Sequence, residues 1–189
     1  MTQLNDLLSQ LTKSSVVKTM GKQVSAEPDQ VKQLIQLGLP TLLQAMNQNA
    51  STPQGAKALS KALDDHKDDP VSNISSYLKN IDTQDGAKIL GHVLGNKSSG
   101  VERKLGAQTG LQPNQVNGLL TQLAPVVMGM LGQQKAQQGI SSDGIGMLLG
   151  GLLGSGDMMG MVTSLLDSDK DGDVMDDVSK LLGGFFGKK

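Results

Sequence analysis

The chain has 189 residues, no cysteine, 24 glycines and a formal net charge of −1. Disulfide bridges are therefore excluded, and a near-neutral charge is not typical of proteins that bind nucleic acid or anionic lipid through clustered Lys and Arg. Because the aromatic residues are limited to Tyr77, Phe185 and Phe186, the core must be built from Leu, Val, Ile, Met and Ala, which favours helices that meet over small residues.

The N-terminal stretch MTQLNDLLSQLTKSS has no charged region followed by a long apolar run, so it predicts no signal peptide. The most apolar stretch, residues 145–153, is far shorter than the roughly 20 residues that a membrane-spanning helix needs. We therefore expect a soluble, cytoplasmic protein with no membrane span, and the composition would fit a bacterial origin.

Two segments of the chain, 14–50 and 99–135, align with each other without gaps, and ten of the 37 paired positions are identical. Two prolines recur at the same spacing, as Pro28 and Pro40 in the first segment and as Pro113 and Pro125 in the second. We interpret the segments as two copies of one helical unit.

Each copy predicts a short helix, at 15–24 or 100–108, followed by a turn and a second helix. The first proline of each copy lies just inside that second helix, where its missing N–H costs nothing. The second proline is expected to kink this helix or to begin another. Apolar residues recur at the spacing of one buried helix face, at Val31, Leu34 and Ile35 and again at Val116, Leu119 and Leu120.

Three more helices are predicted between the copies. Ser51 or Thr52 caps the first, and Asp69 caps the second, which Pro70 opens. The third begins at Thr83 and ends at Gly95. We find no convincing strand alternation, so the predicted class is all-α and multihelical.

A change of composition near residue 139 predicts a domain boundary. Residues 1–138 form the duplicated helical domain, and residues 139–189 form a tail rich in Gly, Met and Leu. Each glycine costs a helix about 1 kcal/mol, so a helix in this tail would be marginal alone.

The turn in each copy has the spacing of a helix-turn-helix motif. The small, turn and apolar positions of the second copy are Gly106, Gly110, Val116 and Leu119. The early turns of its candidate recognition helix carry no Arg or Lys but Pro113, Asn114, Gln115, Asn117 and Gly118. The upstream basic residues Lys97, Arg103 and Lys104 are too few for about 6–10 phosphate contacts. A structural role is therefore favoured and nucleic acid is not the expected partner, with a DNA-binding regulator as the alternative.

The two histidines, His66 and His92, are candidates for metal binding or catalysis. His66 is surrounded by aspartates without a defined ligand spacing, which favours a solvated acidic helix end over a metal site. His92 follows Asp85 on one predicted helix and could act as a base, but no nucleophile motif accompanies it. We therefore expect a partly buried structural histidine at position 92 and no enzymatic activity.

The stretch LDSDKDGDVMDDV, from Leu166 to Val178, resembles an EF-hand calcium loop. Its first positions match in residue type and spacing, whereas position 12 is Val178 in place of a bidentate glutamate. The candidate ligands in loop 167–178 are Asp167, Asp169, Asp171, Asp173 and Asp177. The loop predicts either a weak Ca²⁺ site, with a Kd of about 10⁻⁴–10⁻³ M, or a solvated acidic turn that caps the last helix.

Several stretches together resemble the bacterial domain-of-unknown-function family 937, related to the YidB-like proteins. They are LPTLLQAMNQNASTPQGAKALSKAL, DGAKILGHVLG, GLQPNQVNGLLTQLAPVVMGMLGQQ and DSDKDGDVMDDV, and the resemblance covers about 30–178. It implies a multihelical bacterial protein and no particular activity. From the residues, we expect a non-enzymatic interaction or scaffolding module that binds a protein partner or itself, with Ca²⁺ as the one candidate cofactor.

Overall fold

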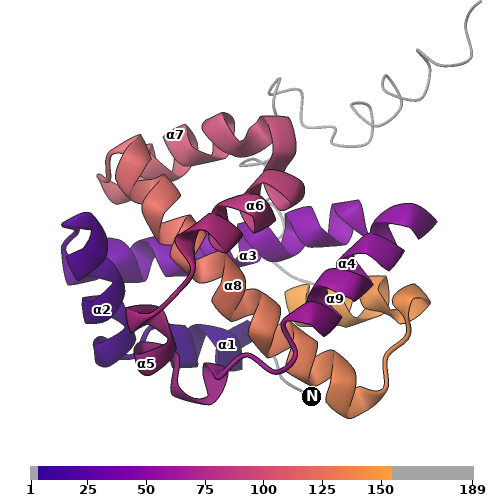
Figure 1. Cartoon of the computed structure of the whole chain (residues 1–189). Helices are drawn as coiled ribbons and strands as arrows, with labels where there is room; N and C mark the ends of the chain where they lie inside the picture. The colour runs from indigo at the N-terminus through magenta and orange to yellow at the C-terminus, as the bar shows by residue number, and fades with distance from the viewer. Residues whose placement is uncertain (1–3, 155–189) are drawn as a thin grey trace, which may run out of the picture.

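The computed structural model describes residues 4–154, and every regular element within this range is a helix, which confirms the predicted class. The α-helices, labelled in Figure 1, are α1 (Leu4–Leu11), α2 (Ser14–Val24), α3 (Pro28–Asn49), α4 (Pro53–Asp65), α5 (Ile74–Lys79), α6 (Thr83–Leu94), α7 (Ser98–Thr109), α8 (Pro113–Gln138) and α9 (Ile145–Leu153). Short 3₁₀ helices precede α5, α7 and α9, namely η1 (Val71–Asn73), η2 (Gly95–Lys97) and η3 (Ser142–Gly144).

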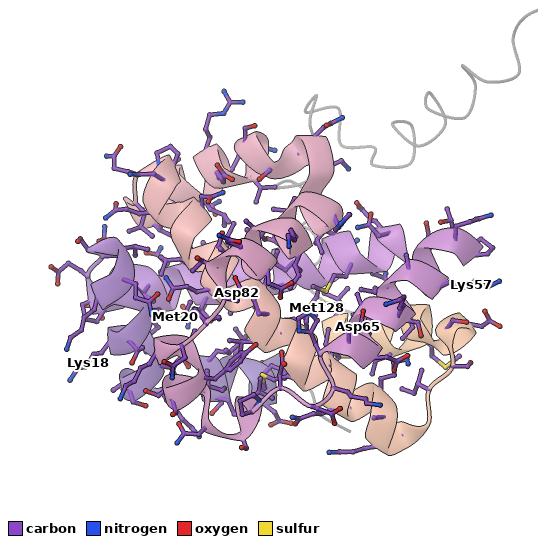
Figure 2. The ribbon with its side chains drawn as sticks, viewed as in Figure 1. Lys18, Met20, Lys57, Asp65, Asp82 and Met128 are labelled. Carbon is purple, nitrogen blue, oxygen red and sulfur yellow. The ribbon has the colours of Figure 1, made fainter. Side chains whose placement is uncertain are left out.

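The two long helices α3 and α8 cross at the centre of the fold, and the other helices are arranged around them (Figure 1). At the crossing, Leu120 of α8 lies 3.1 Å from the point where a Cβ of Gly38 would be, so the glycine admits the neighbouring helix. Methionines fill parts of the core in place of aromatic residues, since Met20 and Met128 are almost fully buried. Lys18, on the same helix as Met20, extends into solvent (Figure 2).

Both prolines expected to kink a helix or begin another lie inside continuous helices. Pro40 is within α3, and Pro125 is within α8. Neither residue begins a new helix, and both are buried. The second proline of each copy is therefore accommodated where tertiary packing surrounds the helix on all sides.

The predicted helix caps are mostly confirmed. Thr52 caps α4 by accepting a hydrogen bond from the Gly55 N–H at 3.1 Å, and Pro28 and Pro113 stand at the first positions of α3 and α8. Helix α6 begins at Thr83 and is capped at its C-terminal end by Gly95, whose φ of 51° favours glycine.

The cap predicted at Asp69 is wrong. Pro70 precedes the 3₁₀ helix η1 and not an α-helix, and α5 starts four residues after Pro70, at Ile74, with Asn73 as its cap. The Asp69 carboxylate instead contacts His66 Nδ1 at 2.9 Å and the Tyr77 hydroxyl at 2.8 Å, both through Oδ2. Side-chain partners brought by the tertiary fold have replaced a local backbone interaction.

Residues 145–153, which the sequence placed in the tail, form α9 against α3. Ile145, Leu149 and Leu152 join the hydrophobic core. The division of the chain into domains near residue 139 stays a prediction, because the rest of the tail lies outside residues 4–154.

Candidate functional site

The five predicted calcium ligands, from Asp167 to Asp177, lie outside the described residues. Within residues 4–154, no group of three or more His, Asp or Glu side chains is arranged to hold a metal ion.

The two predicted helix-turn-helix turns have the same local geometry. Helix α2 is capped by Ser25 with φ of 54°, and α7 is capped by Gly110 with φ of 72°, both in the left-handed conformation. A Cβ placed on Gly21 would lie 2.7 Å from a carbonyl oxygen of its turn, and one placed on Gly106 would lie 2.7 Å from its counterpart. Both glycines are thus needed where the turn folds back over the preceding helix.

Each turn is held by a glutamine from the other predicted copy. Gln30 Nε2 donates to the carbonyl oxygens of Thr109 and Gly110, at 3.3 and 3.2 Å. Gln115 Nε2 donates to those of Val24 and Ser25, at 3.2 and 3.0 Å. Donor and acceptor positions correspond in the two copies, so the same pair of hydrogen bonds is made in both directions.

These contacts occupy the surface that a DNA-binding helix would need. The early turns of α8 lie against α2, and a Cβ on Gly118 would stand 2.7 Å from the Val24 side chain. Asn117 donates to Glu102 at 2.8 Å, and Gln115 is bound to the opposite turn. Because base readout requires such side chains at a free helix surface, the DNA-binding alternative gains no support.

His66 is part of a half-buried polar network, not only of a solvated acidic helix end. Its Nδ1 lies 2.9 Å from Asp69 Oδ2, and its Nε2 lies 3.5 Å from Asp85 Oδ2. The Tyr77 hydroxyl donates to the same Asp69 oxygen at 2.8 Å, and Gln133 of α8 donates to the Asp69 carbonyl oxygen at 2.8 Å. The network joins the end of α4 to α5, α6 and α8.

Burial raises the pKa of Tyr77 well above its ordinary value, and the hydrogen bond to the Asp69 carboxylate raises it further. The negative charges of Asp85 and Asp82 act in the same direction. The phenol is therefore a proton donor that holds the loop after α4, and it is not poised to act as a base.

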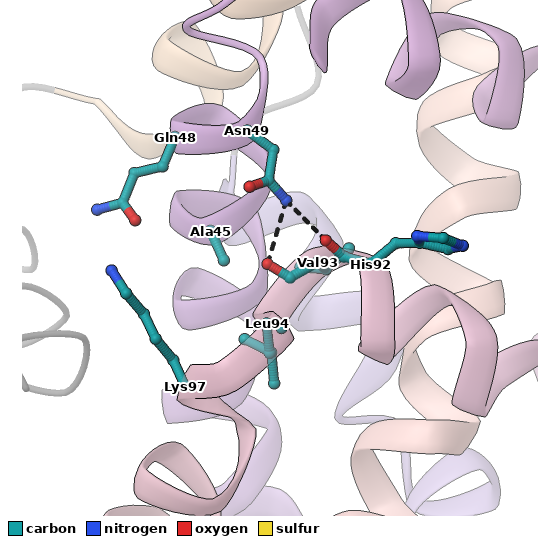
Figure 3. A pocket seen from close by; sticks show the side chains of 8 residues that line it. Ala45, Gln48, Asn49, His92, Val93, Leu94 and Lys97 are labelled. Atoms are coloured by element: carbon teal, nitrogen blue, oxygen red, sulfur yellow. Dashed lines mark hydrogen bonds between the residues drawn. The ribbon is translucent and has the colours of Figure 1, made fainter. Parts of the chain in front are cut away.

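A cavity of about 120 Å³ lies at the end of α6 (Figure 3). Asn49 donates to the carbonyl oxygens of His92 and Val93, both at 3.1 Å, and so satisfies the last carbonyl groups of that helix. The imidazole of His92 points away from the cavity, while Lys97 extends toward Gln48. Since ligand pockets usually enclose about 300–1,000 Å³, the cavity suits a group no larger than a small ion or a few waters.

The predicted histidine and aspartate pair is divided between two places. His92 is exposed on α6, so the expected partial burial of this histidine is wrong, whereas Asp85 contacts His66. A helix rises about 1.5 Å per residue, which separates positions 85 and 92 by roughly 10 Å along the axis.

Helix α9 has one buried and one open face. Met147 on the open face is 84% exposed and is the large hydrophobic side chain left exposed within residues 4–154. A Cβ placed on Gly150 or Gly151 would meet no atom within 4 Å. The open face of α9 is thus uncharged and flat apart from one methionine.

Comparison with known families gives one match. The family described as "Bacterial protein of unknown function (DUF937)" matches residues 5–134. The chain belongs to this family. Comparison with the curated proteins and with the solved structures finds no match.

The DUF937 match confirms the predicted family and refines its extent. It begins within α1, earlier than the predicted start near 30, and it ends within α8. Helix α9 and the acidic loop therefore lie beyond the matched residues, and the relation to YidB-like proteins stays a prediction. Among residues 4–154, no helix is both long and apolar enough to cross a membrane.

Sequence reasoning did not assign functions to Gln30 and Gln115, nor did it pair Tyr77 with Asp69. The glutamines carried a usable signal, because they are identical at matched positions of the two copies. The pairing of Tyr77 with Asp69 had no such signal, since it depends on how the loop after α4 folds back.

Proposed function

We propose that this DUF937 protein is a cytoplasmic, non-enzymatic interaction module that associates with a second copy of itself through the open face of α9. The observation that carries the proposal is the exposure of Met147, at 84%, on a helix whose other face is buried in the core. Contiguous exposed apolar patches mark interaction sites, and Met147 lies on the same open face as the exposed, uncharged Gly150 and Gly151.

The neighbouring helix α4 gives an internal comparison for this surface. Helices α4 and α9 contact each other and lie side by side (Figure 1). The outer side of α4 carries exposed lysines, with Lys57 extending away from the body and Lys61 paired with Asp65 at 2.7 Å (Figure 2). The open face of α9 has no such charges, so it departs from the ordinary solvated surface shown by α4.

A second copy is the occupant that this face fits best. No charged residue is present from Gly144 to Gly154, so the face offers nothing to recognise an acidic or basic partner. Glycines allow a neighbouring helix to come close, and the same flat face on another copy is complementary in a two-fold arrangement. In that arrangement Met147 of each copy covers Gly150 and Gly151 of the other.

The polar groups of the body support a non-enzymatic role. His66, Asp69 and Tyr77 are engaged with one another, and Asn49 caps the end of α6. These side chains hold helices together, whereas catalysis would need a nucleophile with a base directed at an accessible substrate.

We further propose that loop 167–178 binds Ca²⁺ weakly through Asp167, Asp169, Asp171, Asp173 and Asp177. The proposal is supported by the alternating aspartates followed by Gly172, because such a loop supplies the oxygen ligands that calcium prefers. A bound cation would also neutralise aspartates that otherwise repel one another. The expected Kd is about 10⁻⁴–10⁻³ M, since the bidentate glutamate of tuned sites is missing.

Sedimentation over a range of protein concentrations tests self-association in the full chain. We expect a monomer–dimer equilibrium that is lost in Met147→Lys and kept in the control Lys57→Glu, which changes charge on the outer side of α4. A wild-type protein that stays monomeric at the highest concentration, both with calcium and with chelator, would overturn the proposal. Equal loss of the dimer in the control variant would move the interface away from α9.

Calorimetric titration of calcium into chelator-treated protein tests the acidic loop separately. We expect a saturable heat that disappears when Asp169 and Asp171 are both changed to Asn. No heat at millimolar calcium would leave the loop as a solvated acidic turn, without bearing on α9.

A further inference from the structure

We infer that the described body is a two-fold pair of four-helix units fused into one chain, in which each unit gives its fourth helix to the other. The first unit is α1 to α4 and the second is α6 to α9, with η1 and α5 as the connection. The aligned segments 14–50 and 99–135 contain only the second and third helices of each unit, so this arrangement extends the repeat by one helix on either side.

Contacts within each unit follow the same plan. The first helix touches the long third helix, as α1 touches α3 and α6 touches α8. The second helix also packs on that long helix, as α2 does on α3 and α7 does on α8. In each unit, the first and second helices thus pack on a long third helix that contains an internal proline.

The fourth helices are exchanged. Helix α4 packs mainly on α8 of the second unit, and α9 packs mainly on α3 of the first. The fit of α4 is close, because a Cβ on Gly132 of α8 would stand 2.3 Å from the carbonyl oxygen of Leu63. On the other side, Ile145 and Leu149 of α9 are completely buried.

The contacts of the second helices with the opposite long helix are also reciprocal, whereas α6 touches α3 without a matching contact of similar extent between α1 and α8. Helix α2 touches α8 while α7 touches α3, and Gln30 and Gln115 bind each other's turns. A contact from i to j that is repeated from j to i is the property of a two-fold interface between identical subunits. Here both units are parts of one chain, so the interface between them is formed within the chain.

The symmetry fails at identifiable positions. Gln33 of the first unit donates to the Gln108 carbonyl oxygen at 3.1 Å. The matching position of the second unit is Gly118, which cannot donate such a bond and instead leaves room for the side chain of Val24. The second difference is the outer side of the fourth helices, which is charged on α4 and uncharged on α9. The units have therefore diverged while keeping the contacts that hold them together.

Hydrogen exchange measured by mass spectrometry on the full chain tests the helix exchange. Leu34 and Leu119 are matched core positions of the two units, and both are fully buried. We expect Leu119→Ala to increase exchange in α4 more than in α9, and Leu34→Ala to increase exchange in α9 more than in α4. Equal increases in both helices, or the opposite assignment, would overturn the inference.

The glutamine pair provides a second test if a leucine variant does not fold. Gln30→Ala and Gln115→Ala each remove two hydrogen bonds to the opposite turn and one to the start of their own helix. Each should raise the unfolding equilibrium constant by about 5- to 30-fold. The control Gln36→Ala alters an exposed residue of α3 and should change the constant little. The inference fails if the two glutamine variants differ by more than about tenfold, or if neither exceeds the control.

Discussion

Replacing Gly86 by alanine should destabilise the fold, although alanine is the better helix former. Gly86 lies on α6 where that helix meets α8, and a Cβ at this position would stand 2.0 Å from the backbone carbonyl oxygen of Thr121. Ordinary contact begins at 3.4 Å, so the two helices would have to separate by more than 1 Å. No side chain can rotate out of the way, because the obstructing atom belongs to the backbone.

The size of the effect follows from two opposing terms. Alanine in place of glycine favours a helix by about 1 kcal/mol. Overpacking a core costs about 1–3 kcal/mol, and the cost here should lie at the upper end because separation would loosen Ile89, Leu90 and Val93 together. The expected net loss in the free energy of unfolding is about 2 kcal/mol, or roughly 30-fold in the equilibrium constant.

Urea unfolding followed by far-ultraviolet circular dichroism measures this loss, since the chain has no tryptophan and a single tyrosine. With a slope of about 1–3 kcal/mol per molar urea, the midpoint should fall by roughly 1 M. The matched control is Gly91→Ala on the same helix, where a Cβ meets nothing within 4 Å and a gain of up to about 1 kcal/mol is expected. A Gly86→Ala protein as stable as wild type would refute the close approach of α6 and α8.

Three further predictions concern single interactions. The one tyrosine, Tyr77, should titrate above its ordinary pKa of about 10 when followed by ultraviolet absorbance. The stability that Tyr77 contributes should be present below pH 10 and be lost as the pH rises further. A titration midpoint at or below about 10, or the same alkaline loss of stability in Tyr77→Phe, would contradict this. Lys135 is almost fully buried and is paired with the half-exposed Asp64. Asp64→Ala leaves the buried charge without its partner, whereas Lys135→Met removes that charge, so Asp64→Ala should lower the urea midpoint more. The reverse order of the two midpoints would contradict this prediction. Thr52→Ala should cost about 1 kcal/mol in the same assay, because it removes the cap of α4, and an unchanged midpoint would mean that water replaces the cap.

The parts of the fold that depend on neighbouring residues could be predicted from the sequence. The cap at Thr52, the prolines at the first positions of α3 and α8, and the end of α6 at Gly95 all follow from backbone chemistry over a few residues. The apolar spacing of Val31 and Leu34 also identified fully buried positions. In each case the decisive interaction lies within about one helical turn.

The error at Asp69 shows where this reasoning ends. An aspartate before a proline is a good helix cap in isolation, but His66 and Tyr77 both contact its carboxylate in the folded chain. Tyr77 belongs to the helix that Asp69 was expected to cap. Local preference is worth about 1 kcal/mol, which two hydrogen bonds from tertiary partners can outweigh.

The arrangement of the two units could not be predicted either. A repeat in the sequence identifies equivalent helices, but it does not say which long helix each fourth helix will pack on. Glycines inside helices carried part of this information, since Gly86 and Gly132 weaken their helices unless another backbone comes close. Their partners became visible only in three dimensions.

What the two units share is explained by the fold, so function is better sought where they differ. Gln30 and Gln115 have the residue type and helix position of a DNA-reading side chain, yet each holds the other unit's turn. The outer side of the fourth helix is different, because Met147 of α9 contributes nothing to the core while Lys57 of α4 lies on an ordinary solvated surface. Since folding does not require an exposed methionine there, the self-association proposed above would give this side chain a role.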